Sequence, residues 1–156
     1  MALKNQLIKS PKLINTCLKH SDVIVRVKAS HLLRKLEGHE QDSALDIALK
    51  DRFMPIRREA FQIILKRDGN CTLAEKFLFD RHSSIREIAM IHLKQAGIDV
   101  KSIYQMSLKS NQVFVLRGAI WGLAELYSVE SIPQLSKFIQ NPHPSVRKQA
   151  VNALAL

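Results

Sequence analysis

A short motif returns along this chain at a nearly constant spacing, and this spacing limits the fold more than any other feature. The stretch Val25–Leu36 reads VRVKASHLLRKL, with an apolar residue, then arginine, then alanine three residues later. The same order recurs in residues 56–60, 85–89 and 146–150, while residues 115–119 keep the apolar residue and the alanine but move the arginine to Arg117. The anchoring alanines are separated by 31, 29, 30 and 31 residues, and they are Ala29, Ala60, Ala89, Ala119 and Ala150. A fixed period near thirty predicts stacked structural repeats.

Each motif copy has the periodicity of a helix rather than that of a strand. In the first copy the apolar positions follow steps of four, three, one and three, at Val25, Ala29, Leu32, Leu33 and Leu36, which places them on one helical face. A shorter amphipathic stretch precedes each copy, and we predict first helices at 11–19, 42–50, 73–79, 100–109 and 131–139. The sequence therefore predicts an all-α chain of about five helical hairpins.

The predicted repeats cover most of the chain. We expect a single domain over residues 1–156, with repeats at 11–38, 42–69, 72–97, 99–128 and 130–156. Gly38, Gly69 and Gly97 are predicted to end the second helices of the first three repeats, because glycine is favoured just after a helix. The chain stops at Leu156 without a helix-ending signal, which leaves open whether it is a fragment of a longer solenoid or self-associates through its last repeat.

Paired helices with x-[VI]-R-x-x-A at the start of the second helix resemble HEAT repeats. The short period is most similar to the HEAT-like repeats of phycobilin (PBS) lyases and many bacterial scaffold proteins. The resemblance covers residues 11–156 and implies a right-handed α-solenoid whose second helices line the concave face.

In that family, an aspartate or asparagine six residues before the motif arginine helps to form a ladder between neighbouring repeats. Asp51, Asp80 and Asn141 stand at this position, whereas the first repeat has His20 and the fourth has Asn111 before the shifted Arg117. The resemblance therefore implies a structural role for four arginines, which we call the ladder arginines: Arg26, Arg57, Arg86 and Arg147. A half-buried guanidinium needs paired acceptors, and the turn can supply them.

Positions beside the apolar stripe of the second helices are the candidate partner-binding residues. They mix cations, amides and one large aromatic residue: Lys28, His31, Lys35, Arg58, Gln62, Ile91, Arg117, Trp121, Lys148 and Asn152. Trp121 is the only tryptophan, and Gly118 and Gly122 flank it. Two glycines in a helix interior indicate either close packing of the indole or room for a partner.

The positive charge is concentrated near the start of the chain. Residues 1–36 carry +7 of the formal net charge of +10. Such a basic end attracts phosphates or acidic partners, but a solvated, solubilising surface explains the charge equally well.

We find no motif for catalysis, and we expect neither a cofactor nor a metal ion. The six histidines lack paired metal-ligand spacing, and Glu59, Glu87 and Glu125 are not singled out by any partner residue. Basic HEAT-like alkylpurine DNA glycosylases use tryptophans, an acid and an arginine in their concave face. Residues 114–127 resemble their helices, with Trp121 and Glu125 four residues apart, but further aromatic walls are absent.

The favoured function is a non-catalytic scaffold or adaptor that holds a protein or peptide in its concave groove. Two alternatives remain: a nucleic-acid binder that uses the basic N-terminal end, including the glycosylase-like enzyme, and a lyase-type chaperone for a cofactor-bearing protein. Cys17 and Cys71 are predicted to be free thiols, and no apolar run or leader-like start is seen. We therefore expect a cytoplasmic protein without membrane association.

Overall fold

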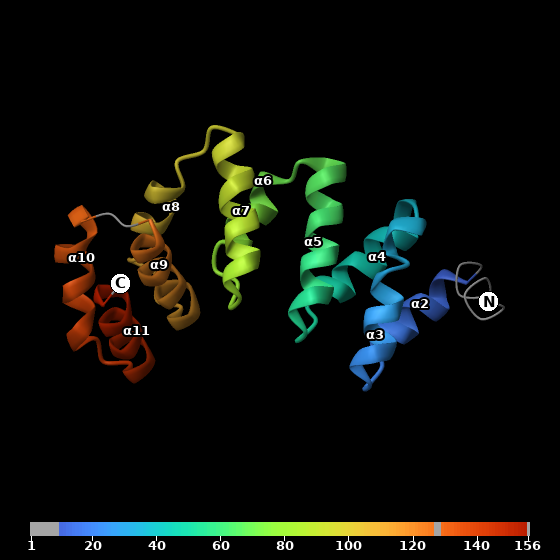
Figure 1. Ribbon diagram of the computed structural model, residues 1–156, viewed down its shortest axis with the longest axis horizontal. Helices are drawn as coiled ribbons and strands as arrows, with labels where there is room; N and C mark the ends of the chain where they lie inside the picture. Colours follow the sequence, from blue (N-terminus) through green and yellow to red (C-terminus); the bar gives the residue numbers. More distant parts are fainter. Residues whose placement is uncertain (1–9, 127–128, 156) are drawn as a thin grey trace. The chain divides into compact units, whose positions relative to one another are not determined.

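The structure is a computed structural model that describes residues 10–126 and 129–155 (Figure 1). Within these residues it is entirely helical, with ten α-helices, three short 3-10 helices and no strand. The all-α prediction is therefore confirmed. The chain divides into two compact parts, an N-terminal part of residues 1–70 and a C-terminal part of residues 71–156, and each is described by itself.

The N-terminal part contains two pairs of helices. Its elements are α2 (Pro11–Leu18), α3 (Val23–Ser30), η1 (Leu33–Lys35), α4 (Gly38–Leu49) and α5 (Met54–Asp68). Helix α2 packs on α3 and α4 packs on α5, while α2 also contacts α4 and α3 contacts α5. First helices therefore lie beside first helices, and second helices beside second helices.

The C-terminal part repeats this pairing. Its elements are α6 (Cys71–Phe77), α7 (Ser83–Gln95), α8 (Val100–Ser107), α9 (Val113–Glu125), η2 (Val129–Ser131), α10 (Ile132–Ser136), η3 (Lys137–Gln140) and α11 (Pro144–Leu154). Helix α6 packs on α7, α8 on α9, and α10 on α11, and α11 also packs on α9.

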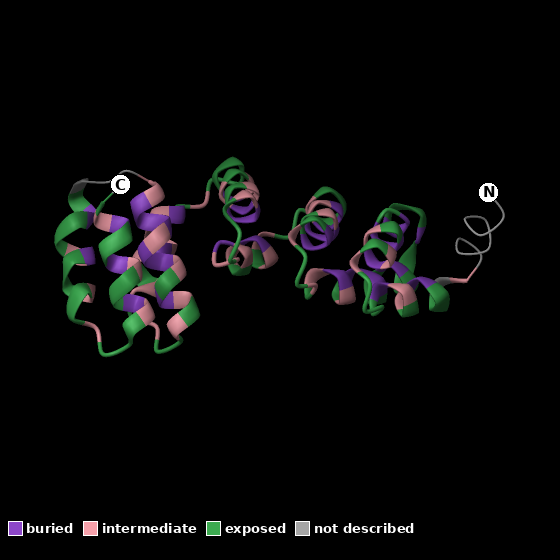
Figure 2. Cartoon of the chain, turned by 60° about the horizontal axis from the view of Figure 1, so that its bottom comes forward, coloured by how far each residue is buried: buried purple, intermediate pink, exposed green. Residues whose placement is uncertain are grey.

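The motif alanines all lie in the buried core. Ala60, Ala89, Ala119 and Ala150 are fully buried, and Ala29 is 2% exposed. Figure 2 shows buried residues concentrated on the faces where paired helices meet. A methyl side chain at this position lets the helices approach closely, so the helical phase read from the sequence is confirmed.

The second helix of the first repeat is shorter than predicted. We expected it to run through Leu36, but α3 ends at Ser30. The Ser30 hydroxyl donates to the Val27 carbonyl at 2.9 Å, and such back-bonding competes with helix continuation. From Leu32 onward the backbone bonds span three residues, giving η1, so Lys35 lies in a 3-10 turn instead of on the second helix.

Gly38 begins a helix instead of ending one. It is the first residue of α4, at a positive φ of 55°, so the prediction that Gly38 ends the second helix of the first repeat is wrong. Gly69 and Gly97 behave as predicted: Gly69 ends α5 in the left-handed conformation, and Gly97 follows the end of α7 with a φ of 76°. Only glycine adopts these conformations without strain.

Candidate functional site

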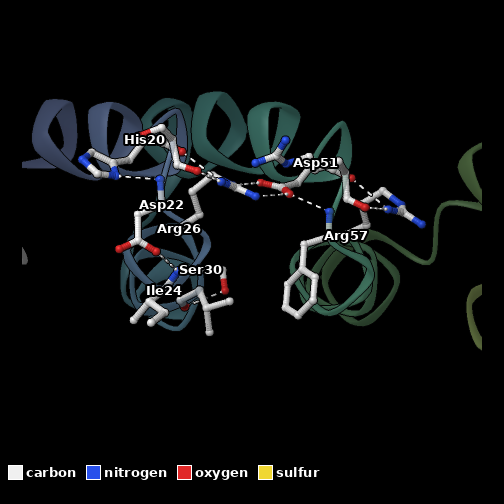
Figure 3. A network of polar contacts seen from close by, with 11 residues as sticks. His20, Asp22, Ile24, Arg26, Ser30, Asp51 and Arg57 are labelled. Carbon is white, nitrogen blue, oxygen red and sulfur yellow. Dashed lines mark hydrogen bonds and ion pairs between the residues drawn. The ribbon is translucent and has the colours of Figure 1, made fainter.

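Arg26 links the two helix pairs of the N-terminal part (Figure 3). Its Nε and Nη2 donate to the two carboxylate oxygens of Asp51, at 2.8 and 3.3 Å, while Nη1 donates to the carbonyls of His20 and Ser21. The side chains of Arg26 and Asp51 are only 7% and 5% exposed. This bidentate, charge-assisted contact is a rung of the predicted ladder.

The other ladder arginines bind the turn before their own helix in the same way. Nη1 of each donates to backbone carbonyls of that turn: Asp51 and Arg52 for Arg57, Asp80 for Arg86, and Asn141 and Pro142 for Arg147. The predicted structural role of these arginines is therefore confirmed for their contacts to the turns. They should not be counted as a nucleic-acid patch.

The fourth motif copy has lost its ladder arginine. Leu116 occupies the equivalent position on α9, three residues before Ala119, and is 7% exposed. The shifted Arg117 lies one residue later and is exposed. An apolar residue therefore replaces a cation at the buried position, and the cation faces solvent.

Glu125 is held by two donors, contrary to our expectation that no partner singles it out. Arg86 Nη2 donates to Glu125 Oε1 at 2.7 Å, and the Trp121 indole N–H donates to the same oxygen. The Arg86 side chain is 9% exposed and that of Glu125 is 32% exposed. Arg86, Trp121 and Glu125 thus form one cluster between α7 and α9, which we call the Glu125 cluster.

Glu59 also has a partner that the sequence did not reveal. Arg34 Nε donates to Glu59 Oε1 at 2.6 Å, and this ion pair raises the pKa of the Arg34 guanidinium. Arg34 is one of the cations that make the N-terminal end basic, so part of that charge is already compensated within the protein.

Two aromatic rings pack beside the Glu125 cluster. Tyr104 is 1% exposed, and its ring meets Phe79 edge-to-face with 5.9 Å between centroids. Burial raises the pKa of Tyr104 to about 12, with a further rise from Glu125 and an opposing effect of Arg86.

The two glycines beside Trp121 make this packing geometrically feasible. A Cβ at Gly122 would lie 2.2 Å from the Tyr104 ring, and one at Gly118 would lie 2.9 Å from the ring of Phe79. The rings that these glycines accommodate are therefore those of Tyr104 and Phe79, whereas the sequence had suggested close packing of the indole itself or room for a partner.

The predicted partner-binding residues of the N-terminal part are largely exposed. Lys28 lies on α3 and Arg58 on α5, where both face solvent, and Gln62 on α5 is half-buried. His31 caps the C-terminal end of α3 and is exposed, as is Lys35 in η1. Only Lys28, Arg58 and Gln62 therefore occupy second α-helices as predicted.

The residues predicted in the C-terminal part all lie on second helices. Ile91 on α7 is 47% exposed, Arg117 on α9 is exposed, and Lys148 and Asn152 on α11 are exposed. Trp121 on α9 is half-buried because its indole takes part in the Glu125 cluster.

A groove on the first helices of the C-terminal part was missed by the sequence reasoning. It is an open groove of about 510 Å³ between the end of α8 and the α10–η3 segment. Its lining residues are Gln105, Met106, Leu108, Lys109, Gln134, Lys137 and Phe138. The sequence-based prediction placed the binding residues on second helices only; the signal for this groove is an apolar, lysine-flanked segment on each of two neighbouring first helices.

The last helix carries the apolar residues for which we predicted either self-association or continuation of the chain. Val151 on α11 is 53% exposed and Leu154 is half-buried. Leu156, the third residue of that prediction, lies outside the described residues, as does the predicted repeat end at 127–128.

A scan of the sequence against protein-family models and a search of curated proteins both gave no match. Within residues 10–126 and 129–155, no cluster of three or more His, Cys, Asp or Glu side chains is arranged to hold a metal ion. In the same ranges, no helix is both long and apolar enough to cross a membrane.

Proposed function

We propose that this protein is a non-catalytic scaffold of HEAT-like repeats that holds a protein or peptide partner. The helical hairpins, about five in number, would form a right-handed solenoid in which the second helices line the concave binding face. The observation that carries the proposal is that the cations fall into two groups, those with partners inside the described part of the protein and those without. The ladder arginines bind turns and carboxylates, whereas the side chains of Lys28, Arg58, Arg117 and Lys148 are exposed and make no hydrogen bond or ion pair with the described residues.

The pattern of these exposed positions favours a protein partner over nucleic acid. Within the C-terminal part, the exposed cations Arg117 on α9 and Lys148 on α11 are accompanied by Glu87 and the apolar Ile91 on α7. A nucleic-acid surface needs a continuous positive track along the phosphates. A mixed surface of cations, amides and an indole is instead typical of a protein interface.

One observation favours an alternative, the glycosylase-like enzyme. The Glu125 cluster joins an acid, a tryptophan and an arginine, which are the residue types that the resemblance implies for that site. The neighbouring Tyr104 ring is buried and cannot offer a second aromatic wall to a ligand from solvent. The scaffold proposal is therefore preferred, in a cytoplasmic setting, and the lyase-type chaperone remains a special case of it.

A capture experiment with matched variants tests the scaffold proposal. The immobilised protein is exposed to nuclease-treated and untreated lysate of its source cell. The test variant Arg58→Glu/Arg117→Glu/Lys148→Glu changes the second helices. A control variant, Lys19→Glu/Lys50→Glu/Lys76→Glu, makes the same charge change at exposed positions on or just after first helices. We expect the immobilised protein to retain partner proteins from both lysates, with and without nuclease treatment. The control variant should still retain these proteins, and the test variant should not.

A direct binding assay tests the nucleic-acid alternative. Duplex and single-stranded DNA and RNA are titrated at about 50 mM salt, where phosphate contacts are strongest. If nucleic acid is the partner, Lys28→Gln/Arg34→Gln/Lys35→Gln should weaken binding to all sequences alike and flatten the salt dependence. Retention that disappears after nuclease treatment, together with such binding, would overturn the scaffold proposal.

A further inference from the structure

The groove between α8 and the α10–η3 segment has a composition that fits one class of ligand. Met106, Leu108 and Phe138 provide its apolar surface, and Met106 is 68% exposed. A methionine this exposed gives little to the core. Methionine adapts its shape to different partners and is over-used at binding surfaces, so an exposed methionine at an apolar groove indicates a contact surface.

The polar residues of the groove are all cationic or amide residues. Lys109 and Lys137 are exposed, and neither makes an ion pair within the described residues; no acid lines the groove. Gln105 and Gln134 complete the lining, and each amide offers both donors and an acceptor. Amides of this kind suit the alternating N–H and C=O groups of a peptide backbone.

The volume of this open groove fits a small ligand segment rather than a folded surface. About 510 Å³ lies inside the range of about 300–1,000 Å³ that is common for ligand pockets. One or two large apolar side chains would fill such a space, with the flanking chain passing over its rim.

We propose that this groove binds a short peptide segment of a partner protein in which large apolar side chains are flanked by carboxylates. The apolar side chains contact Met106, Leu108 and Phe138, and the carboxylates approach Lys109 and Lys137. The site lies on first helices, so it goes beyond the concave-face function proposed above. Charge complementarity selects the occupant, because a groove with two uncompensated lysines repels a basic segment.

Two other occupants fit less well. The chain's own first nine residues, MALKNQLIK, contain two lysines and no acid, so the groove lysines would repel them. A nucleic-acid strand would satisfy the lysines, but its phosphates and sugars would leave the apolar surface without a matching partner.

Three labelled probes test the proposal by fluorescence anisotropy with the full chain. The first is a peptide of phenylalanine and leucine flanked on each side by three glutamates. The second replaces these two apolar residues with serine and keeps the charge. The third is a single-stranded oligothymidine with the same number of negative charges. We expect the first probe to bind, and the Kd of each of the other two probes to be at least about tenfold higher.

Variants then locate the binding. Met106→Asp should raise the Kd of the first probe at least about tenfold, because it places a negative charge in the apolar surface and the probe is itself negatively charged. Lys109→Gln/Lys137→Gln should weaken it about fivefold at 50 mM salt and much less at 500 mM, since salt screens exposed charges. The matched control Lys76→Gln/Lys94→Gln removes two exposed lysines from α6 and α7 and should leave the Kd within about twofold.

Two further results separate this site from the concave face and from misfolding. Arg117 lies on α9, in the proposed concave face, so Arg117→Gln should leave probe binding unchanged. The groove proposal can therefore hold even if the scaffold proposal fails. Circular dichroism must show unchanged helix content for each variant. Equal binding of the serine peptide or oligothymidine, no binding of the first probe at millimolar concentration, or equal weakening by the control variant would each overturn the proposal.

Discussion

Arg26 and Arg86 occupy the same position of the repeated motif but meet different acceptors. In the N-terminal part, Arg26 binds both oxygens of Asp51, which comes from the turn between α4 and α5. In the C-terminal part, Arg86 reaches one oxygen of Glu125 at the end of α9, and Trp121 shares that oxygen. The corresponding turn position of the fourth repeat holds Asn111 instead of an aspartate.

The two rungs therefore differ in how completely they are satisfied. Asp51 Oδ1 also accepts the Phe53 backbone N–H at 2.7 Å, which fixes the carboxylate within its turn. In the other rung, Arg86 Nε is buried and has no hydrogen-bond partner in the described residues. The comparison teaches that the motif specifies where the guanidinium lies, while the neighbouring repeat decides how well it is paired.

Removing Asp51 should have the largest effect on stability. Asp51→Ala leaves the buried Arg26 guanidinium without its carboxylate and should lower the free energy of unfolding by about 3–5 kcal/mol. Glu125→Ala should cost about 1–3 kcal/mol, because Glu125 is partly exposed and already satisfies Arg86 incompletely. Urea unfolding followed by circular dichroism measures both values. Asp46→Ala, at an exposed site of α4, is the control and should change stability by less than about 0.5 kcal/mol. Equal losses for Asp51 and Glu125 would remove the distinction between the rungs.

Overpacking the buried alanine positions of the two parts should destabilise both parts to a similar extent. Ala60→Leu on α5 and Ala89→Leu on α7 insert a branched side chain at fully buried positions, and each should cost about 1–3 kcal/mol. Thermal unfolding of both variants provides the measurement. A large effect of one substitution and none of the other would mean that the parts differ in packing as well as in their rungs.

Substitutions of the glycines beside Trp121 test the packing under the Glu125 cluster. Alanine usually stabilises a helix by about 1 kcal/mol relative to glycine. At Gly122 the new methyl would lie 2.2 Å from the buried Tyr104 ring, so Gly122→Ala should instead destabilise the protein by about 1–3 kcal/mol. Gly118→Ala approaches Phe79 at 2.9 Å and should have a smaller effect. A stabilising Gly122→Ala would show that the Tyr104 ring can move aside.

The smallest expected effect is on the titration of Tyr104. Burial is the main cause of its raised pKa of about 12, so Glu125→Gln should lower that pKa only partly, to a value still above the ordinary 10.0. The folded state keeps the phenolic proton that the unfolded state loses above pH 10, so stability should fall as the pH rises from 10 towards 12. Ultraviolet absorbance at alkaline pH, in a Tyr127→Phe background, follows the titration of Tyr104. An unchanged pKa in Glu125→Gln would show that the carboxylate does not influence the phenol.

Much of the fold could be predicted from local rules, although the rule that glycine ends a helix failed at Gly38. The alanine column and the glycines at 69 and 97 follow from periodicity and backbone conformation, and the structure bears them out. The end of α3 at Ser30 did not follow, because its apolar spacing continues to Leu36 while a hydroxyl competes for the backbone.

The polar clusters were harder to predict because their partners are distant in sequence. Arg86 and Glu125 are 39 residues apart, and the arrangement depends on which face of α9 meets α7. The motif rule pointed to Asn111 as the acceptor position, and only the three-dimensional structure reveals Glu125. The groove on α8 and α10–η3 likewise arises from two segments that each carry a lysine beside apolar residues, and only the fold brings these segments together.

The carbonyl contacts of the ladder arginines also change how the charge of this protein should be counted. His20 and Ser21 follow the C-terminal end of α2, and Asp51 and Arg52 follow that of α4. A guanidinium at such a place opposes the partial negative charge of the helix dipole. The ladder arginines act in this respect as internal counter-ions of the first helices, so the formal charge of +10 overstates the electrostatic potential that an approaching partner experiences.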